Sequence, residues 1–138
     1  MINTPEINIA SLLVSLTRTL YRTLRTVAPT CSFLEMKTLV FVSEKKNPTM
    51  KDLADELGIS SPAMTAVVDK LVKNDDLNRI ADKSDRRITR ISLTAQGKKT
   101  LEKNRSTVFE AFNKRASVLN DIEKAELSRL LTKLQNNQ

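Results

Sequence analysis

The sequence predicts a mainly α-helical fold that contains one small β-hairpin. The 138 residues include only two glycines and no tryptophan, and they are rich in Leu, Ala, Lys and Glu, which favour helices. Residues 77–93 differ, because β-branched and charged residues alternate there on both sides of the charged segment DKSDRR. At this length we expect one domain, residues 1–138, with a substantial hydrophobic core.

The first helix is expected over residues 7–28, ended by Pro29. Apolar residues recur there in steps of three and four and form a single stripe. The opposite face carries Arg18, Arg22 and Arg25, which form either a solvated face or a contact to an anion or a partner. The stripe consists of Ile9, Leu13, Leu16, Leu20, Leu24 and Val27.

A second helix is expected over residues 33–43. Ser32 and Glu35 have the spacing of a capping box, in which each side chain binds the backbone N–H of the other residue. Residues 45–48 then form a loop. The inward face of this helix is predicted to be Phe33, Met36, Leu39 and Val40.

Two short helices joined by a tight turn follow. Thr49 is expected to cap the helix MKDLADEL, and Gly58 to supply the left-handed residue that ends it. Ser60 or Ser61 caps the next helix, which runs to residue 73 and has Pro62 in its first turn. This is the pattern of a helix-turn-helix unit.

The outer face of the helix from residue 61 to 73 is small and carries no acid before Asp69. Such a face can lie close to base edges in the major groove of DNA, although an ordinary surface helix with small residues is the alternative. The core face is predicted to be Met64, Val67, Val68, Leu71 and Val72. The candidate DNA contacts are Ser61, Pro62, Ala63, Thr65, Ala66 and Lys70.

The hairpin strands are predicted at Leu77–Ala81 and Arg87–Leu93. Cations at a hairpin tip can reach the minor groove, where the potential is most negative. Asp85 is close enough to hold Arg86 or Arg87 by a charge-assisted hydrogen bond. The alternative is that both arginines only brace the hairpin against Asp82 and Asp85. We call this hairpin the wing, and its candidate DNA contacts are Lys83, Asp85, Arg86 and Arg87.

Thr94 is expected to cap a long helix running to about residue 118, and Asp121 to cap a last helix. Together with the first helix, these segments carry more apolar surface than one small winged unit can cover. We therefore expect a DNA-binding lobe over residues 32–97 and a homodimer formed through residues 1–30 and 98–138. The apolar positions are Leu101, Val108, Phe112, Ala116, Leu119, Ile122, Ala125, Leu130, Leu131 and Leu134.

The charge distribution supports a nucleic-acid partner. The formal net charge is +7, and residues 61–105 hold eleven Lys and Arg against six Asp and Glu. The chain has no His and no pair of acids among apolar residues, which argues against an enzyme, a His-based zinc site or another metal site, and we expect no cofactor. There is no apolar run of roughly 20 residues, no signal peptide and a single Cys, so we expect a cytoplasmic protein without a membrane partner.

Cys31 allows two interpretations. It precedes a predicted helix start, where a reactive thiolate is favoured, but its neighbourhood is mostly apolar and no basic residue lies within five positions.

The segments MKDLADELGISSPAMTAVVDKLV and DRRITRISLTAQG resemble those of the MarR family of bacterial transcriptional regulators. Asp85, Arg87, Leu93 and Thr94 meet the family's Asp-x-Arg-x5-Leu-Thr spacing. The resemblance implies a dimeric winged helix-turn-helix repressor of double-stranded DNA, often released by a small aromatic or anionic effector. It also implies that Asp85 steadies the wing and that arginines at or beside Arg87 reach DNA. Two recognition helices related by a two-fold axis should read an inverted repeat.

The sequence departs from the family pattern after the recognition helix. Family members usually have Gly and then an apolar residue there, whereas this chain has Asp75 and Asp76. Aspartate tolerates the left-handed conformation, so the backbone need not change, but two acids near phosphates would weaken DNA binding. The alternative function is therefore a winged-helix interaction module that has lost DNA binding.

Overall fold

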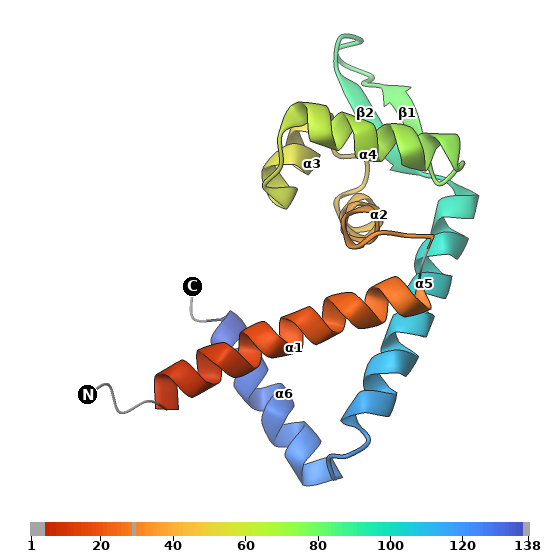
Figure 1. Ribbon diagram of the computed structural model, residues 1–138. Helices are drawn as coiled ribbons and strands as arrows, with labels where there is room; N and C mark the ends of the chain where they lie inside the picture. The colour runs from red at the N-terminus through yellow and green to blue at the C-terminus, as the bar shows by residue number, and fades with distance from the viewer. Residues whose placement is uncertain (1–4, 29, 137–138) are drawn as a thin grey trace.

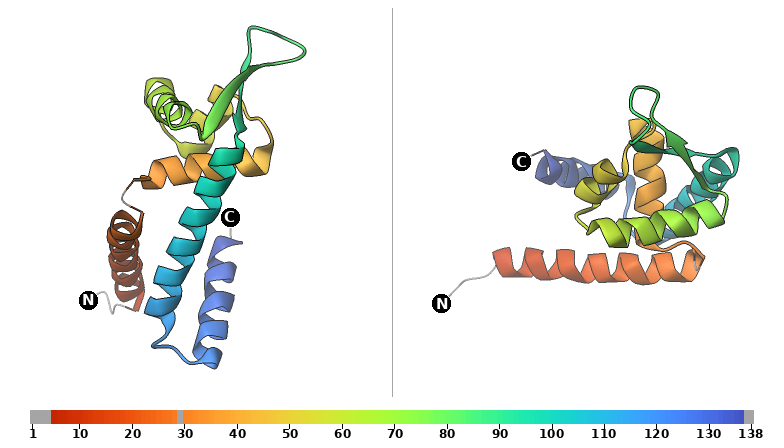
Figure 2. Two further views of the ribbon diagram at one scale, coloured as in Figure 1. Left: turned by 90° about the vertical axis from the view of Figure 1, so that its right-hand side faces the viewer. Right: turned by 90° about the horizontal axis from the view of Figure 1, so that it is seen from above.

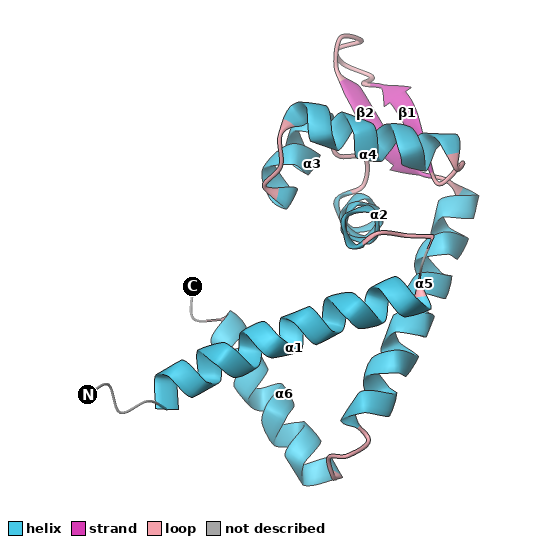
Figure 3. Cartoon of the chain, viewed as in Figure 1, coloured by secondary structure: helices cyan, strands magenta, loops and turns pink. Residues whose placement is uncertain are grey.

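The computed structural model describes residues 5–28 and 30–136, which form six helices and one two-stranded antiparallel sheet (Figure 1, Figure 3). The predicted mainly helical fold with a β-hairpin wing is confirmed. The elements are α1 (Pro5–Val27), α2 (Phe33–Lys45), α3 (Met50–Leu57), α4 (Ser61–Lys73), β1 (Leu77–Ala81), β2 (Thr89–Leu93), α5 (Ala95–Ala116) and α6 (Asp121–Gln135).

The helices separate into two lobes that α5 connects. Helices α2, α3 and α4 and the hairpin form one lobe, and the hairpin extends beyond it into solvent (Figure 2). Helix α1 contacts α5, and α6 returns along the far half of α5 on the side away from α1 (Figure 2). No helix in the described part of the chain is long and apolar enough to cross a membrane.

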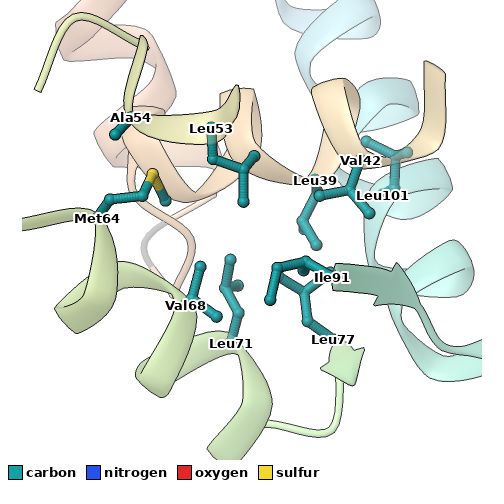
Figure 4. Close-up of a cluster of buried hydrophobic side chains, with 10 residues drawn as sticks. All are labelled: Leu39, Val42, Leu53, Ala54, Met64, Val68, Leu71, Leu77, Ile91 and Leu101. Carbon is teal, nitrogen blue, oxygen red and sulfur yellow. The ribbon is translucent and has the colours of Figure 1, made fainter. Parts of the chain in front are cut away.

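The hydrophobic core lies inside the lobe that contains the helix-turn-helix (Figure 4). Every element of that lobe contributes to it, and α5 adds its first turns. Burying one Leu, Ile or Met side chain stabilises the fold by about 1.5–3 kcal/mol, so this cluster is the main source of stability. Its members are Leu39, Val42, Leu53, Ala54, Met64, Val68, Leu71, Leu77, Ile91 and Leu101.

Phe33, which was predicted to face the core, is instead 41% exposed. Its ring packs edge-on against Tyr21 of α1, with 4.8 Å between the ring centroids. The helical spacing of α2 placed Phe33 on its apolar stripe, but Phe33 lies at the first residue of α2, where it packs against α1 and not in the core.

Side-chain caps set the helix starts. Ser32 with Glu35, and Thr49 with Asp52, form capping boxes. Ser60, one of the two candidates, caps α4. The cap predicted at Asp121 is wrong, because Asn120 accepts the N–H of Glu123 and forms a capping box with it.

Several predicted boundaries change at the ends of elements, and α1 covers Pro5–Val27 where residues 7–28 were predicted. Helix α2 runs on to Lys45 before Lys46 and Asn47 take positive φ angles of 50° and 66°. Helix α5 ends at Ala116, where the Ser117 hydroxyl donates to the carbonyl of Lys114. Strand β2 begins at Thr89, not at residue 87, for reasons that lie in the wing tip.

Asp75 and Asp76 form the junction between α4 and the wing. Asp75 has a φ of 61°, so it takes the left-handed conformation expected of the family's glycine. Asp76 is only 5% exposed, and its carboxylate accepts a 2.6 Å hydrogen bond from the Thr100 hydroxyl. The expectation that both acids lie near phosphates is therefore wrong for Asp76, which stabilises the contact with α5.

Candidate nucleic-acid interface

Helix α4 presents an uncharged outer face through its first two turns. Met64, Val68 and Leu71 point into the core and fix the rotation of the helix. All the predicted contacts in these turns, Ser61, Pro62, Ala63, Thr65 and Ala66, are exposed as a result. The Thr65 hydroxyl donates to the carbonyl of Ser61 at 2.9 Å, so it retains acceptor capacity toward a base edge.

Lys70, which is predicted to contact DNA, also binds a neighbouring helix, and its side chain remains 54% exposed. Its Nζ lies 2.7 Å from Oε1 of Glu35 in α2, and the Glu35 side chain is only 8% exposed. The hydrogen bond and charge of Glu35 raise the pKa of Lys70 above its usual range. Glu35 Oε2 accepts the N–H of Ser32, so both carboxylate oxygens are used. Lys70 thus fastens α4 to α2.

The wing tip is a turn held by two carboxylates. Asp82 Oδ1 accepts the backbone N–H groups of Ser84 and Asp85, at 2.8 and 3.0 Å. Asp85 Oδ1 in turn accepts the N–H of Arg87 at 3.0 Å and its Nε at 3.2 Å. These bonds keep Arg87 in the turn, which is why the return strand starts two residues later than predicted.

The cationic side chains of the wing tip remain exposed to solvent. The Arg87 side chain is 92% exposed despite its contact with Asp85. Lys83 and Arg86 are exposed, and neither forms an ion pair within the described residues. Of the two predicted pairings of Asp85, the structure has the one with Arg87 and not the one with Arg86.

Arg90 is a structural residue that sequence reasoning missed. Its guanidinium forms an ion pair with Asp82, whose side chain is 12% exposed, and donates to the carbonyl of Asn47 at 3.1 Å. The hydrogen bond from Arg90, followed by the amides of Asp85 and Ser84, lowers the pKa of Asp82 to about 2. Strand alternation assigned Arg90 only to the face opposite Ile91. Because Ala81 pairs with Thr89, the register also places Asp82 diagonally beside Arg90.

The recognition helix and the wing lie at the same end of the molecule, away from α1 and α6 (Figure 1, Figure 2). A helix of this size fits the major groove, and a hairpin beside it can reach the adjacent minor groove. An ion pair between Asp69 of α4 and Arg79 of β1, 2.5 Å apart, spans the two elements.

A cavity of about 400 Å³ lies between α1 and the start of α2, and Lys70 of α4 also lines it. Burial, followed by the charges of Glu35 and Asp76, raises the pKa of the Cys31 thiol to about 11, so the interpretation as a reactive thiolate is not supported. No cluster of three potential metal ligands occurs in the part of the chain that the structure describes. The cavity is lined by Tyr21, Leu24, Arg25, Ala28, Thr30, Cys31, Ser32, Phe33 and Lys70.

Comparison with known proteins yields a consistent group of relatives. The model of the MarR family matches residues 33–89. The uncharacterized HTH-type transcriptional regulator YpoP of Bacillus subtilis (strain 168) is 37% identical over 100 residues, covering 72% of this chain and 71% of YpoP. The fold of apo MarR from E. coli superimposes with a TM-score of 0.82 at 23% identity, covering 91% of this chain and 94% of that one. The fold of Bordetella bronchiseptica BpsR, whose DNA binding is regulated by 6-hydroxynicotinic acid, superimposes with a TM-score of 0.75 at 17% identity, covering 94% of each chain.

Proposed function

The chain belongs to the MarR family of transcriptional regulators, and from this premise we propose that it is a homodimeric repressor that binds an inverted repeat in double-stranded DNA. The observation that carries the proposal is the joint exposure, at one end of the molecule, of the uncharged face of α4 and the cationic wing tip. Ser61, Pro62, Ala63, Thr65 and Ala66 would contact bases or phosphates in the major groove. Lys83, Arg86 and Arg87 would contact the flanking minor groove or its phosphates.

The alternative of an interaction module without DNA binding rested on Asp75 and Asp76. Asp76 is buried against Thr100, and Asp75 occupies the backbone conformation of the family's glycine. Both residues thus have a structural role at this junction, and neither requires the loss of DNA binding. The function as a DNA-binding repressor is therefore favoured over that of an interaction module without DNA binding.

Dimerisation is proposed from the apolar surface that one chain leaves uncovered. All residues of α6 are exposed, with Ile122 at 82% and Leu134 at 61%. The first half of the α1 stripe is also open, with Ile9 at 55%. A second copy would cover both helices, since contiguous apolar patches of this kind mark association surfaces.

Release by a small effector is proposed at the cavity between α1 and α2. Its wall combines two aromatic rings, Tyr21 and Phe33, with two cations, Arg25 and Lys70. This lining suits a small aromatic anion. Such a ligand would compete with Glu35 for Lys70 and could thereby shift α4.

The decisive experiment is fluorescence anisotropy with a random-sequence duplex at low salt, followed by selection of tight sites from a random pool. We expect non-specific binding that weakens with added salt and a selected site with two-fold symmetry. Ala63→Asp should abolish specific binding without unfolding the protein, because Ala63 is exposed and the acid would face the bases. An absence of duplex binding at low salt, with the wild-type fold intact, would contradict the proposal.

A further inference from the structure

Arg90 joins three segments of the helix-turn-helix lobe. From strand β2, its Nε donates to Asp82 at the start of the wing tip, and its Nη1 donates to the carbonyl of Asn47 in the loop between α2 and α3. The other oxygen of Asp82 accepts the amides of Ser84 and Asp85. One guanidinium therefore connects the strand, the tip and the body of the lobe.

The loop end of this connection is itself held in place. The carbonyl of Pro48 accepts the N–H of Ile91 at 2.8 Å, and Thr49 forms an isolated bridge with Arg90. Pro48 is buried, and Ile91 is fully buried in the core. The carbonyl of Asn47 thus provides a fixed point to which the tip can be attached.

The placement of the wing cations depends on this attachment. Asp82 holds the amide of Asp85, and the Asp85 carboxylate holds both the N–H and the Nε of Arg87. An isolated two-stranded hairpin is marginally stable in water, so an extended tip would move without such contacts. The series of bonds from Asn47 through Arg90, Asp82 and Asp85 ends at the residues proposed to contact DNA.

We propose that Arg90 is a positioning residue of the wing, which holds Arg86 and Arg87 in one orientation relative to α4 through its bonds to Asp82 and Asn47. This inference rests on the proposed DNA binding. In it Arg90 acts through the two bonded groups and makes no DNA contact of its own.

The substitution Asp82→Asn tests the sign of the effect. Removing an acid near DNA would strengthen binding if Asp82 were only a surface charge, since repulsion of phosphates would fall. If the bond between Arg90 and Asp82 instead anchors the wing tip, Asp82→Asn loses this anchor. Binding should then be about fivefold weaker or more, measured by anisotropy on the selected duplex. Stronger or unchanged binding would overturn the inference.

Substitutions of Arg90 itself separate geometry from charge. Arg90→Lys keeps the charge, but one ammonium lacks the fork that reaches both Asp82 and Asn47, so we expect weakened binding. Wild-type affinity in Arg90→Lys would overturn the inference.

Arg79→Gln is the matched control for Arg90→Gln, because both arginine side chains are 38% exposed and ion-paired. The partner of Arg79, Asp69, is 57% exposed and does not belong to the wing tip. We expect the control to change affinity less than about twofold.

A double-mutant cycle tests whether Arg90 acts through the wing. Once Arg90→Gln has released the tip, adding Arg86→Ala should cost less than about twofold, whereas the same addition to Arg79→Gln should keep its full effect. Additive effects with Arg90→Gln, or wild-type affinity in Arg86→Ala alone, would overturn the inference.

Amide hydrogen exchange in the free protein gives a result that does not depend on DNA. Arg90→Gln should speed exchange at Ser84 and Asp85 by about tenfold while core amides such as those of Leu53 and Val68 stay protected. Unchanged exchange at the tip would overturn the inference. Failure of the wild-type protein to bind duplex DNA with this exchange result intact would instead contradict the proposed function and leave the anchor in place.

Discussion

Gly97 lies where the first turn of α5 meets the backbone of Asp76. A Cβ atom at Gly97 would lie 2.0 Å from the carbonyl oxygen of Asp76, which also accepts the N–H of Thr94 at 3.1 Å. The absence of a side chain is thus required by close approach and not by a positive φ. The glycine in the segment LTAQG lets the junction between α4 and the wing pack closely against α5.

Gly97→Ala should lower the free energy of unfolding by about 1–3 kcal/mol, because backbone atoms must move to accept the methyl group. Urea denaturation followed by circular dichroism would measure this. Gly58→Ala is the control: Gly58 has a φ of 63° but nothing within 4 Å of its Cβ position, so only backbone strain of about 1 kcal/mol applies. A Gly97→Ala protein as stable as the wild type would contradict the docking argument.

Cys31 should react slowly with alkylating agents. Its pKa is raised from 9.0 to about 11 by burial and by the charges of Glu35 and Asp76. At pH 8 the thiolate population, and hence the rate with iodoacetamide, should be about a hundredfold below that of an ordinary thiol. The rate should rise about tenfold per pH unit up to the pKa. The urea-unfolded protein is the control, and equal rates in both states would contradict the prediction.

At the scale of the element, the wing shows which features a sequence reveals. The caps at Ser32 and Thr49 and the turn at Gly58 were predictable because their bonds join residues within three or four positions. The pairs Glu35–Lys70 and Asp76–Thr100 join residues 35 and 24 positions apart, and no local pattern indicates them. The tip was mispredicted because Asp82 and Asp85 bind backbone amides and so replace two residues of strand pairing by a turn.

Arg86→Ala should weaken DNA binding by about 1–3 kcal/mol and make the salt dependence shallower by about one phosphate contact. The melting temperature should barely change, because Arg86 forms no ion pair within the described residues. Arg87→Ala should also weaken binding with little loss of stability, since its pair with Asp85 is solvent-exposed. Anisotropy titrations at several salt concentrations measure both. Wild-type affinity and salt slope in Arg86→Ala would exclude the wing from DNA binding.

The pKa of Asp82 reports the integrity of the wing. A lowered pKa means that its contribution to stability is present above the ordinary value of 3.8 and is lost as pH falls through about 2. Arg90→Gln should raise this pKa toward 3.8, though not fully, because the amides of Ser84 and Asp85 still donate. Carboxyl NMR titration measures it. Glu126 of α6, whose pKa is lowered by the hydrogen bond from Arg129, should not change and is the control.

At the scale of the whole molecule, most of the large exposed apolar side chains lie outside the lobe that contains the buried core. The core cluster includes no residue of α1 or α6, whereas those helices carry large exposed apolar side chains. The fold of one chain therefore leaves its two end helices incompletely packed. The sequence predicted this imbalance because the apolar stripes were longer than a winged unit can use, but it could not show that α1 and α6 flank α5 on opposite sides (Figure 2).

If a second copy covers these helices, the protein should sediment as a dimer at micromolar concentration. Leu134→Lys should shift it toward the monomer, because a charge would be buried in an apolar interface. Thr132→Lys adds the same charge about 160° around α6 from Leu134 and is the control. A wild-type monomer at micromolar concentration, or a dimer insensitive to Leu134→Lys, would contradict the use of α6 in dimerisation.

Dimer symmetry fixes the form of the DNA site. A two-fold axis relates two α4 helices, so the half-sites should be inverted and about 10 base pairs apart, one helical turn along the same face of the duplex. Hydroxyl-radical footprints of the wild-type protein should show two protected major-groove segments flanked by protection from the two wings. Leu134→Lys should bind the full site more weakly while a single half-site keeps its affinity, because only pairing is lost. A footprint without symmetry would contradict the dimeric mode of binding.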